Sequence, residues 1–308
     1  MVHLYVKTLK NDATTHQQKC FLRKLMPKIR RSTVRKIKKF TIDFGGRFFV
    51  LLFFVSFTWY VSSKSFVDSP PESNPHSFHY KILETDTCSD QPNMTVVILA
   101  HSSPSNIERR NSLRRSWANY KLLGSQNTSL LFFMGHSRSS QINKAIVRES
   151  ELHHDIIQED YVDSYRNMTY KFMSAIKWTI KFCSHVRYVL KVDDDVFVNI
   201  HALGPFLRKP EITSLLDYRS ILCKTCVNEK PVRRQRKHFS KWVVTFREFR
   251  ARVYPVYCSG MFVLLSLKNA KKIFEMSMQL SYFWIDDVFM TGIVAAKLNL
   301  LHYHLPNI

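Results

Sequence analysis

Three short apolar runs stand out in the pattern of the chain after residue 93. Residues 95–100, 130–134 and 188–192 are rich in β-branched or aromatic side chains and contain few polar residues. Runs of this kind are typical of strands buried on both faces of a parallel sheet. The sequence therefore predicts three inner strands.

Two stretches between these runs favour helices. Residues 108–120 are predicted to form one helix and residues 165–183 a second. Because strands and helices alternate, we predict an α/β fold with a mostly parallel sheet flanked by helices. The apolar stripe of the second helix recurs at every fourth position, at Met168, Phe172, Ile176 and Ile180.

The longest apolar run, residues 48–61, precedes this pattern. Counted from Phe44 it holds 18 residues, and a helix of that length reaches roughly 27 Å, enough for a thin internal membrane. Arg47 lies near its start, where its side chain can reach the interface. A cleaved signal peptide fits poorly, because a long charged segment precedes the run and no small-residue cleavage site follows it. We predict an uncleaved transmembrane signal anchor.

Basic residues set the predicted orientation. Residues 1–47 hold thirteen Lys and Arg against two Asp, whereas residues 62–92 hold two basic residues. The positive-inside rule places the tail in the cytosol and the rest of the chain in the lumen. Four prolines among Ser, Asp and Asn mark residues 62–92 as an extended stem. Residues 93–308 remain as the folded domain.

Three glycosylation acceptors agree with a lumenal domain. Asn-X-Thr or Asn-X-Ser triplets begin at Asn93, Asn127 and Asn167. All three follow the predicted anchor.

The net charge of +22 divides evenly along the chain. The tail carries +11, from thirteen basic and two acidic residues, and the region after the anchor carries +11, from 33 basic and 22 acidic residues. A basic run beside an anchor is more often a topology signal that touches anionic lipid, so we predict no nucleic-acid partner. The later excess gathers in residues 230–252, for which a solvated face and a contact with an anionic acceptor or donor phosphate both stay open.

Five cysteines follow the anchor, an odd number for an oxidising lumen. At least one thiol therefore stays free or pairs between chains. Cys223 and Cys226 have the spacing of half a zinc site, but no second cysteine pair lies nearby, so disulfides are favoured.

Three consecutive carboxylates, Asp193, Asp194 and Asp195, follow the third apolar run. In open α/β sheets ligands bind beyond the carboxyl ends of the strands, where these side chains emerge. Carboxylates this close repel, so they stay ionised only beside a cation or hydrogen-bond donors. Oxygen ligands suit Mn²⁺ or Mg²⁺, and such ions commonly bind substrate phosphates. The triplet predicts a nucleotide-diphosphate site.

Simpler explanations compete with this one. A calcium loop needs Gly at its sixth position and Glu at its twelfth, and Val198 and Gly204 stand there, so this explanation fails. A phosphatase pattern is weak because Phe197 occupies a position that favours Thr or Val. A solvated acidic turn stays open as an alternative.

Five blocks, in this order, resemble the β1,3-galactosyltransferase family of Golgi glycosyltransferases, which includes β1,3-N-acetylglucosaminyltransferases and Fringe-like enzymes. The match covers roughly residues 95 to 300 and agrees in both order and spacing. The blocks are Val96-Val-Ile-Leu-Ala-His-Ser-Ser-Pro with Arg109-Arg-Asn-Ser-Leu-Arg-Arg-Ser-Trp117, Leu131-Phe-Phe-Met-Gly135, residues 155–171 with Asp163-Ser-Tyr-Arg-Asn-Met-Thr169, Val192-Asp-Asp-Asp-Val-Phe-Val-Asn199, and Tyr254-Pro-Val-Tyr-Cys-Ser-Gly260 followed by Trp284-Ile-Asp-Asp-Val-Phe289.

The resemblance implies a GT-A fold and an inverting sugar transfer from a UDP-sugar to a glycan acceptor, assisted by Mn²⁺. It assigns Asp195 as the metal ligand, and Asp193 and Asp194 to contacts with ribose, sugar or metal-bound water. Asp287 matches the Asp of the family's Glu-Asp-Val motif and is the candidate base. Asp286 stands where the family usually has Glu and is assigned to acceptor contacts.

Two arginines complete the predicted site. Arg110 and Arg114 are four residues apart, on one face of the helix predicted there. They are candidates for binding the diphosphate, with ion pairing as the alternative.

The predicted function is that of a Golgi β1,3-galactosyltransferase, a single-pass type II membrane protein that uses UDP-galactose. UDP-N-acetylglucosamine is the alternative donor, and an inactive relative that binds a glycan or a partner is the alternative function. Family members usually continue past the Asp-Val-Phe block and supply a metal-binding His, whereas His302 and His304 follow Asp287 too closely to be equated with it. That departure, which suggests a C-terminally shortened domain, favours the binding protein, and the four intact aspartates favour the enzyme.

Overall fold

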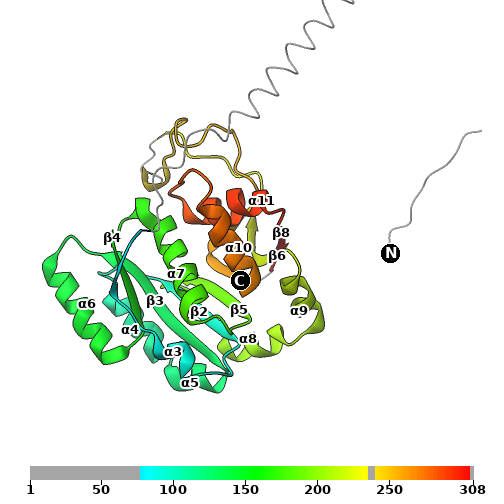
Figure 1. The fold of residues 1–308 in the computed structure, drawn as a ribbon. Helices are drawn as coiled ribbons and strands as arrows, with labels where there is room; N and C mark the ends of the chain where they lie inside the picture. Colours follow the sequence, from blue (N-terminus) through cyan, green and yellow to red (C-terminus); the bar gives the residue numbers. More distant parts are fainter. Residues whose placement is uncertain (1–76, 235–239, 306–308) are drawn as a thin grey trace, which may run out of the picture. The chain divides into compact units, whose positions relative to one another are not determined.

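A mixed eight-stranded sheet organises the described part of the chain (Figure 1). The computed structural model describes residues 77–234 and 240–305. The strands lie in the order β1-β4-β3-β2-β5-β7-β6-β8. Their bounds are β1 (Tyr80–Ile82), β2 (Val96–His101), β3 (Thr128–His136), β4 (Ile156–Val162), β5 (Tyr188–Asp193), β6 (Ser220–Cys226), β7 (Tyr257–Ser266) and β8 (Leu301–His304).

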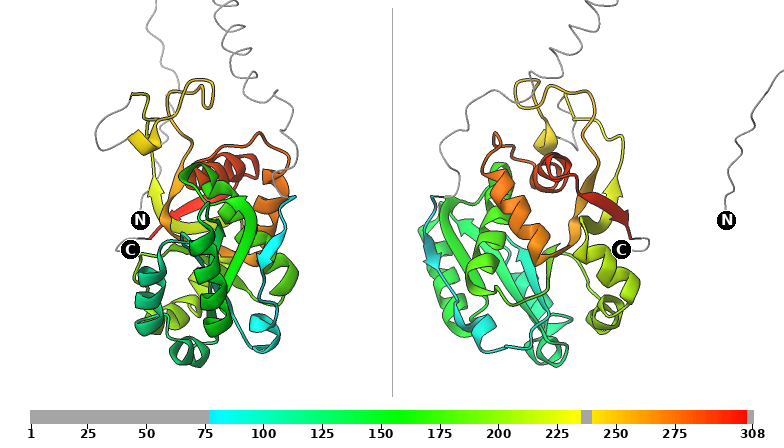
Figure 2. Two further views of the ribbon diagram at one scale, coloured as in Figure 1. Left: turned by 90° about the vertical axis from the view of Figure 1, so that its left-hand side faces the viewer. Right: turned by 45° about the vertical axis from the view of Figure 1, so that its right-hand side comes forward.

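Helices connect these strands and cover both faces of the sheet (Figures 1 and 2). The α-helices are α3 (Asp86–Ser89), α4 (Ile107–Arg115), α5 (Tyr120–Ser125), α6 (Ser140–His153), α7 (Met168–Phe182), α8 (Ile200–Leu207), α9 (Pro210–Asp217), α10 (Leu267–Ser277) and α11 (Ala295–Lys297). The other helical turns are the 3-10 helices η1 (Tyr165–Asn167) and η2 (Ser240–Trp242) and the π-helix η3 (Asp287–Val294).

The three predicted inner strands are β2, β3 and β5. They pair in parallel, with β2 between β3 and β5, and β3 pairs in parallel with β4. The carboxyl ends of these four strands therefore meet at one edge of the sheet, where His101 of β2 is the register partner of Asp193 of β5.

The sheet is mixed rather than uniformly parallel, because three of its seven pairings are antiparallel, while β6 and β8 pair in parallel like the four inner strands. β7 runs antiparallel to both β5 and β6, and β1 runs antiparallel to β4. Antiparallel neighbours need no helical crossover, and the described residues between β6 and β7, 227–234 and 240–256, contain no α-helix. This arrangement brings the start of β7 to the same edge as the end of β5.

The helix predicted over residues 108–120 is shorter in the structure, and a second helix, α5, begins at Tyr120. α4 ends at Arg115, and Ser116 leaves helical geometry. The buried side chain of Trp117 donates a hydrogen bond to the Val196 carbonyl at 3.1 Å, which fixes the chain between the helices. Asn119 then caps α5 by accepting from the Lys121 amide at 3.1 Å.

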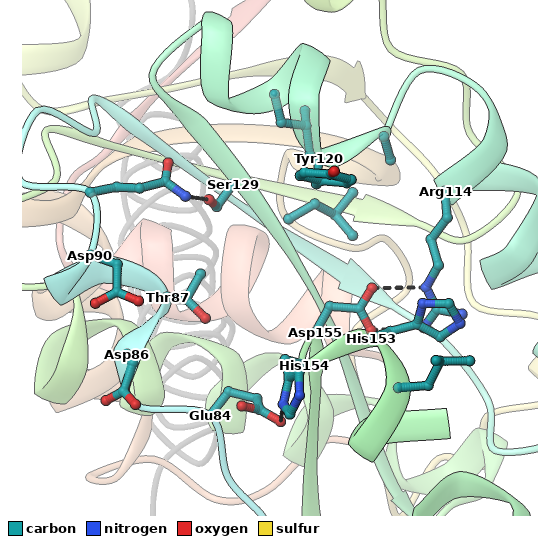
Figure 3. A pocket seen from close by; sticks show the side chains of 15 residues that line it. Glu84, Asp86, Thr87, Asp90, Arg114, Tyr120, Ser129, His153, His154 and Asp155 are labelled. Atoms are coloured by element: carbon teal, nitrogen blue, oxygen red, sulfur yellow. Dashed lines mark hydrogen bonds and ion pairs between the residues drawn. The ribbon is translucent and has the colours of Figure 1, made fainter. Parts of the chain in front are cut away.

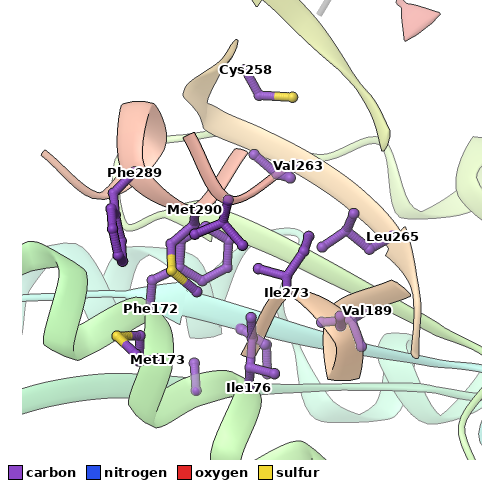
Figure 4. Packing of buried hydrophobic residues seen from close by; sticks show 14 of the residues in the cluster. Phe172, Met173, Ile176, Val189, Cys258, Val263, Leu265, Ile273, Phe289 and Met290 are labelled. Carbon is purple, nitrogen blue, oxygen red and sulfur yellow. The ribbon is translucent and has the colours of Figure 1, made fainter. Parts of the chain in front are cut away.

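Two apolar clusters fill the two sides of the sheet. Along β2, Val97 and Leu99 belong to one cluster, while Ile98 and Ala100 belong to the other. Alternation of this kind follows from the two-residue period of a strand. The first cluster packs α7, α10 and η3 against β5 and β7 (Figure 4).

The folded domain begins before the predicted boundary at residue 93. Residues 80–92 were expected to belong to the stem, but they contain β1 and α3. Cys88 in α3 is buried and bonded to Cys183 after α7, 95 residues away. Pairing with β4 and this disulfide hold the segment on the domain.

The remaining membrane predictions lie outside the described residues. These are the tail at 1–47, the anchor at 48–61 and the first part of the stem, residues 62–76. Within residues 77–234 and 240–305, no helix has both the length and the apolar content needed to cross a bilayer.

The stripe on α7 gives a test of this packing. Ile176 is fully buried in the first cluster, whereas Ile180 is partly buried at its margin. We expect Ile176→Ala to lower the free energy of unfolding by about 2–5 kcal/mol, because it removes buried methylenes and leaves a cavity. Urea unfolding of Ile176→Ala beside Ile180→Ala checks this expectation, and equal losses would contradict the packing described.

Candidate active site at the carboxyl edge of the sheet

The acidic triplet begins with the last residue of β5 and lies at the carboxyl edge, as predicted. The Asp194 amide donates to the His101 carbonyl at 3.1 Å, and the Val196 amide donates to the Asp193 carbonyl at 3.2 Å. The chain therefore turns sharply after the strand. This turn sends the three carboxylates into three different environments.

Asp194 is the buried member of the triplet, with 4% of its surface exposed. Its carboxylate accepts hydrogen bonds from Ser102 at 2.7 Å, from Asn106 at 2.9 Å and from Arg109 at 3.0 Å. All three donors lie in the connection from β2 to α4 or at the start of α4. Asp194 thus ties this connection to the end of β5.

Asp193 and Asp195 are more open. The Asp195 side chain is 59% exposed, and its Oδ2 accepts from Arg109 at 2.8 Å. The Asp193 side chain is 33% exposed, and its Oδ1 accepts from Lys191 Nζ at 2.7 Å. Both carboxylates present oxygen to solvent at the edge where a substrate would bind.

Lys191 is the buried cation of the site. Besides Asp193, its ammonium group donates to the Gly260 carbonyl and lies 3.9 Å from Asp286. Burial lowers the lysine pKa, but the carboxylates of Asp193 and Asp286 outweigh it, so the pKa of Lys191 is raised. A Cβ at Gly260 would lie 3.2 Å from Nζ, so glycine leaves the room that this approach requires.

Asp286 and Asp287 face the same ammonium group from the start of η3. Both line a cleft of about 510 Å³ together with Asp193 and Lys191. Burial and then the charge of Asp286 raise the pKa of Asp287 to about 7. The pKa of Asp286 is also raised, first by burial, although Lys191 opposes the shift. A carboxylate with a pKa near neutral is suited to accept and release a proton.

His101 is a neighbour of this pair that the sequence analysis missed. Its ring is buried, and Nδ1 lies 3.7 Å from Asp286 Oδ2. Within the described residues, neither ring nitrogen nor that oxygen has a hydrogen-bond partner. Burial, then the nearby charges of Lys191 and Lys171, lower the pKa of His101, so the ring stays neutral beside Asp286.

The signals for the missed residues are visible in the sequence. Lys191 interrupts an otherwise apolar strand, and His101 ends the apolar run of β2. A polar residue at the end of an inner strand lies at the same edge as the other strand ends, where ligands bind. Arg109 directly precedes Arg110, one of the two arginines predicted to bind the diphosphate.

Arg110 is placed in a buried ion pair rather than in the cleft. Its side chain is fully buried, and it donates to both oxygens of Glu149 at 2.7 and 2.6 Å. It also donates to the hydroxyl of Ser102 at 3.0 Å and to the Ser103 carbonyl at 2.6 Å. Because no part of it is exposed, Arg110 acts on a ligand only through neighbours such as Ser102.

Arg114 lies one turn further along α4, toward the opposite edge of the sheet. It donates to both oxygens of Asp155, which precedes β4, at 2.8 and 2.7 Å. It also lines a separate hollow of about 660 Å³ with Asp155, His153 and Tyr120 (Figure 3). The structure therefore brings Asp193, Asp286 and Asp287 together but sets Arg114 apart from them.

The three predicted glycosylation sites differ in exposure. Asn93 and Asn127 are exposed, and Asn127 has a positive φ of 50° at the turn before β3. Asn167 is half-buried, and its amide donates to the Val162 carbonyl at 2.8 Å. Glycosylation at these positions stays a prediction.

The cysteines and late histidines take structural partners. Cys223 is bonded to Cys258, which excludes the zinc site considered for Cys223 and Cys226, and Cys226 is the free thiol among the described residues. His302 contacts the Thr291 carbonyl at 2.6 Å, and His304 contacts the Thr225 hydroxyl at 3.0 Å. Neither histidine lines the cleft.

The donor set around Asp195 suits a hard divalent ion that also binds phosphate. Oδ1 of Asp195 accepts no hydrogen bond from the described residues, and Asp193 is the nearest carboxylate in sequence with an exposed surface. Mg²⁺-like ions are commonly held by one or two carboxylates, with waters and substrate phosphates as the other ligands. In residues 77–234 and 240–305, no group of three or more His, Cys, Asp or Glu is arranged to hold a metal, so substrate oxygens would have to complete the shell.

The triplet offers a stability test of these different roles. Asp194→Ala leaves Arg109, Ser102 and Asn106 without their buried acceptor, so we expect it to cost about 3 kcal/mol of folding free energy. Asp195→Ala removes an exposed carboxylate, and we expect a loss below about 1 kcal/mol. Urea unfolding of the two variants measures the difference, and a reversed order would contradict the assignment of Asp194 as the structural member.

Comparisons with known proteins place the chain in a family. The galactosyltransferase family model matches residues 108–306. The chain is 32% identical over 238 residues to human β1,3-galactosyltransferase 2, covering 76% of this chain and 55% of that protein. It is 30% identical over 227 residues to mouse β1,3-galactosyltransferase 1, covering 74% and 67%. The matched region thus spans about half the length of the first of these relatives.

A solved structure is also similar, at a level too low to identify a common fold. It is the apo form of mouse xyloside xylosyltransferase 1, with a TM-score of 0.31, 14% identity, and coverage of 69% of this chain and 84% of that one. The family model covers well over half of the present chain. The chain therefore belongs to the galactosyltransferase family.

Proposed function

We propose that the protein is an inverting β1,3-glycosyltransferase that moves galactose from UDP-galactose to a glycan acceptor on a glycoprotein or glycolipid. The observation that carries the proposal is the Asp287 carboxylate, which lies in a cleft at the carboxyl edge with a pKa of about 7. Membership of the family and the neighbouring Asp193 support it. The mixed sheet covered by helices is compatible with the GT-A fold that we propose for the domain.

Asp287 is the proposed base. Inversion needs the acceptor oxygen to attack the anomeric carbon on the face opposite the departing UDP, and a base must take the proton of that hydroxyl. Asp287 Oδ1 accepts from the Val288 amide at 2.7 Å, which holds the carboxylate in place. Asp286 and Lys191 set its charge environment, because Asp286 raises its pKa and Lys191 lowers it.

Asp195, with Asp193 beside it, is proposed to hold Mn²⁺ together with the donor diphosphate. A bound Mn²⁺ supplies Lewis-acid stabilisation of the charge on the departing diphosphate. Asp194 holds the connection from β2 to α4 in place and thereby orients Arg109, which reaches Asp194 and Asp195.

Two alternatives concern the donor and the activity. UDP-N-acetylglucosamine is the second candidate donor. An inactive relative that binds a glycan or a partner is the second candidate function, and it gains support because the described residues hold no three-ligand metal group. The raised pKa of Asp287 in the cleft supports the enzyme, because strongly shifted carboxylates in clefts are concentrated at catalytic sites.

The compartment and the membrane anchor are part of the proposal. The basic tail before residue 48 and the apolar run at 48–61 support a single-pass type II protein of the Golgi membrane with its catalytic domain in the lumen. Exposed Asn93 and Asn127 are compatible with glycosylation there.

Release of UDP by the purified full-length protein tests the function and the base together. With acceptor glycans present, we expect Mn²⁺-dependent release from UDP-galactose, and Asp287→Asn should lower kcat by at least about 10²-fold, the usual scale for loss of a general base. Turnover of the unmodified protein should rise with pH through about 7, because Asp287 must be deprotonated to act.

The outcomes separate the candidates. Release from UDP-N-acetylglucosamine alone would change the donor, and no release from any UDP-sugar would favour the binding protein. Unchanged turnover in Asp287→Asn would move the base elsewhere, with Asp286 as the next candidate.

A binding measurement tests the proposed metal ligand. Asp195→Ala should abolish the Mn²⁺-dependent part of UDP binding in calorimetry, because it removes the proposed carboxylate ligand. Asp287→Asn is the matched control and should bind UDP as before, since the base acts on the acceptor. UDP affinity that stays Mn²⁺-dependent and unchanged in Asp195→Ala would contradict the assignment.

A further inference from the structure

A strongly basic segment spans residues 229–252 of the sequence, and its described residues, 229–234 and 240–252, border the cleft. It contains nine Lys and Arg against Glu229 and Glu248. Glu248 is already paired with Arg166. Six basic residues of the segment are exposed and form no ion pair with any carboxylate that the structure describes: Lys230, Arg234, Lys241, Arg247, Arg250 and Arg252.

The backbone on both sides of these cations is held in place. Arg233 donates to the carbonyls of Val244 at 3.1 Å, Thr245 at 2.9 Å and Ala251 at 2.8 Å, and its guanidinium stacks on Phe246 at 4.1 Å. Arg233 thus serves the loop itself. Unlike Arg233, the six exposed cations form no ion pair within the described residues, so they are free to bind an anion.

Two of the six, Lys230 and Lys241, line the same cleft as Asp287. The Lys241 ammonium lies 4.4 Å from the centre of the Trp242 ring and 5.2 Å from that of Tyr165. Tyr165 in turn contacts Trp284 with 5.8 Å between ring centres. An aromatic wall with an ammonium group on it therefore faces the cleft, and such cation–π contacts fix a lysine that would otherwise be mobile.

The position of the base indicates what this wall contacts. If Asp287 removes the proton of the acceptor hydroxyl, the acceptor sugar occupies the cleft beside it. Aromatic rings supply the flat apolar surface on which a sugar face packs, and a few polar groups fix its orientation. The carboxylates of the cleft come from β5 and η3, apart from Glu229, whereas its two unpaired ammonium groups come from the basic segment. A negatively charged substituent would be repelled by the former and attracted by the latter.

The donor diphosphate is the other anion that these lysines could take. Asp195, the proposed metal ligand, does not line this cleft, whereas Asp287, the proposed base, does. Asp193 lines it as well, but its carboxylate lies beside Lys191 rather than beside the lysines of the basic segment. The acceptor is therefore favoured as the source of the anion.

We propose that the acceptor is an acidic glycan, and that Lys241, with Lys230, binds a carboxylate or sulfate group of its sugar while the wall of Tyr165, Trp242 and Trp284 packs against the ring. This inference rests on the proposed transferase function and names its acceptor class. Because the two lysines are exposed, salt should screen their attraction for an anionic acceptor and weaken the preference for it.

Matched acceptor pairs test the inference. Aryl β-galactosides, β-glucosides and β-N-acetylglucosaminides are each compared with a counterpart that carries a carboxylate or a sulfate at C6, using the purified full-length protein and its preferred UDP-sugar. For the sugar that is accepted, we expect kcat/KM to be about fivefold to tenfold higher for the anionic member, and the ratio to fall toward one in high salt.

Three variants assign the effect to the cleft. Lys241→Gln should lower kcat/KM for the anionic member far more than for the neutral member, so that most of the preference is lost while Mn²⁺-dependent UDP binding stays the same, and Lys241→Arg should restore the preference. Arg247→Gln is the matched control, because Arg247 is an exposed cation of the same segment that does not line the cleft, and it should keep the preference.

The contrary outcomes are distinct. Equal transfer to both members of every accepted pair, or a preference that survives in Lys241→Gln, would overturn the inference and leave the transferase function intact. Weaker UDP binding in Lys241→Gln would show that the lysine serves the donor and would also overturn it. Absence of transfer to every acceptor would contradict the proposed function and this inference with it.

Discussion

The arrangement of the cleft depends on one buried ammonium group, that of Lys191. A lysine in the middle of an apolar strand is costly unless carboxylates and carbonyls surround it. Lys191 meets this requirement by reaching Asp193 on its own strand, Gly260 on β7 and Asp286 at the start of η3. Three elements that are distant in sequence therefore share one cation, and its removal would leave two carboxylates without their counter-charge.

The antiparallel insertion of β7 makes this contact possible. A fully parallel sheet would bring the amino end of the next strand to the opposite edge, far from Asp193. Because β7 runs against β5, its first residues, including Gly260, lie beside the last residues of β5. The absence of a Cβ at Gly260 leaves space for the ammonium group and for Asp287. The site is thus built on one of the antiparallel pairings that the sequence pattern did not predict.

The sequence predicted those features of the fold and site that are encoded by neighbouring residues. Buried strands are continuous apolar runs, so β2, β3 and β5 were evident, and the stripe on α7 was evident from its period. The acidic triplet and Asp287 were found because they lie in contiguous motifs. The direction of β7, the different roles of the three aspartates and the role of His101 depend on contacts between residues far apart in sequence, such as Val192 with Phe262, Ser102 with Asp194 and His101 with Asp286. No local pattern encodes those contacts.

The same limit explains the arginines. Spacing correctly placed Arg110 and Arg114 on one face of a helix, but spacing carries no information about which carboxylates lie opposite. Glu149 and Asp155 belong to the end of α6 and the start of β4, and they take up both guanidinium groups. Burial of Arg110 makes its pairing obligatory, because a buried unpaired charge destabilises strongly. Arg109 lies outside that pair, and for this reason it is the arginine available to the acidic triplet.

The environment that suits Asp287 for proton transfer also opposes folding. Its pKa is about 7 in the folded protein, against an ordinary value of 3.8. Between these values the folded state binds a proton that the unfolded chain has released, so the associated stability is fully present below about pH 4 and is lost as pH rises through about 7. Asp287 becomes deprotonated, and so able to act as a base, over the same pH interval.

Burial also raises the pKa of Asp286. When both carboxyl groups are ionised, Lys191 must therefore offset two buried negative charges. A cleft that was optimised for stability alone would not place two carboxylates there, and their presence is the physical argument that this part of the fold is shaped by chemistry.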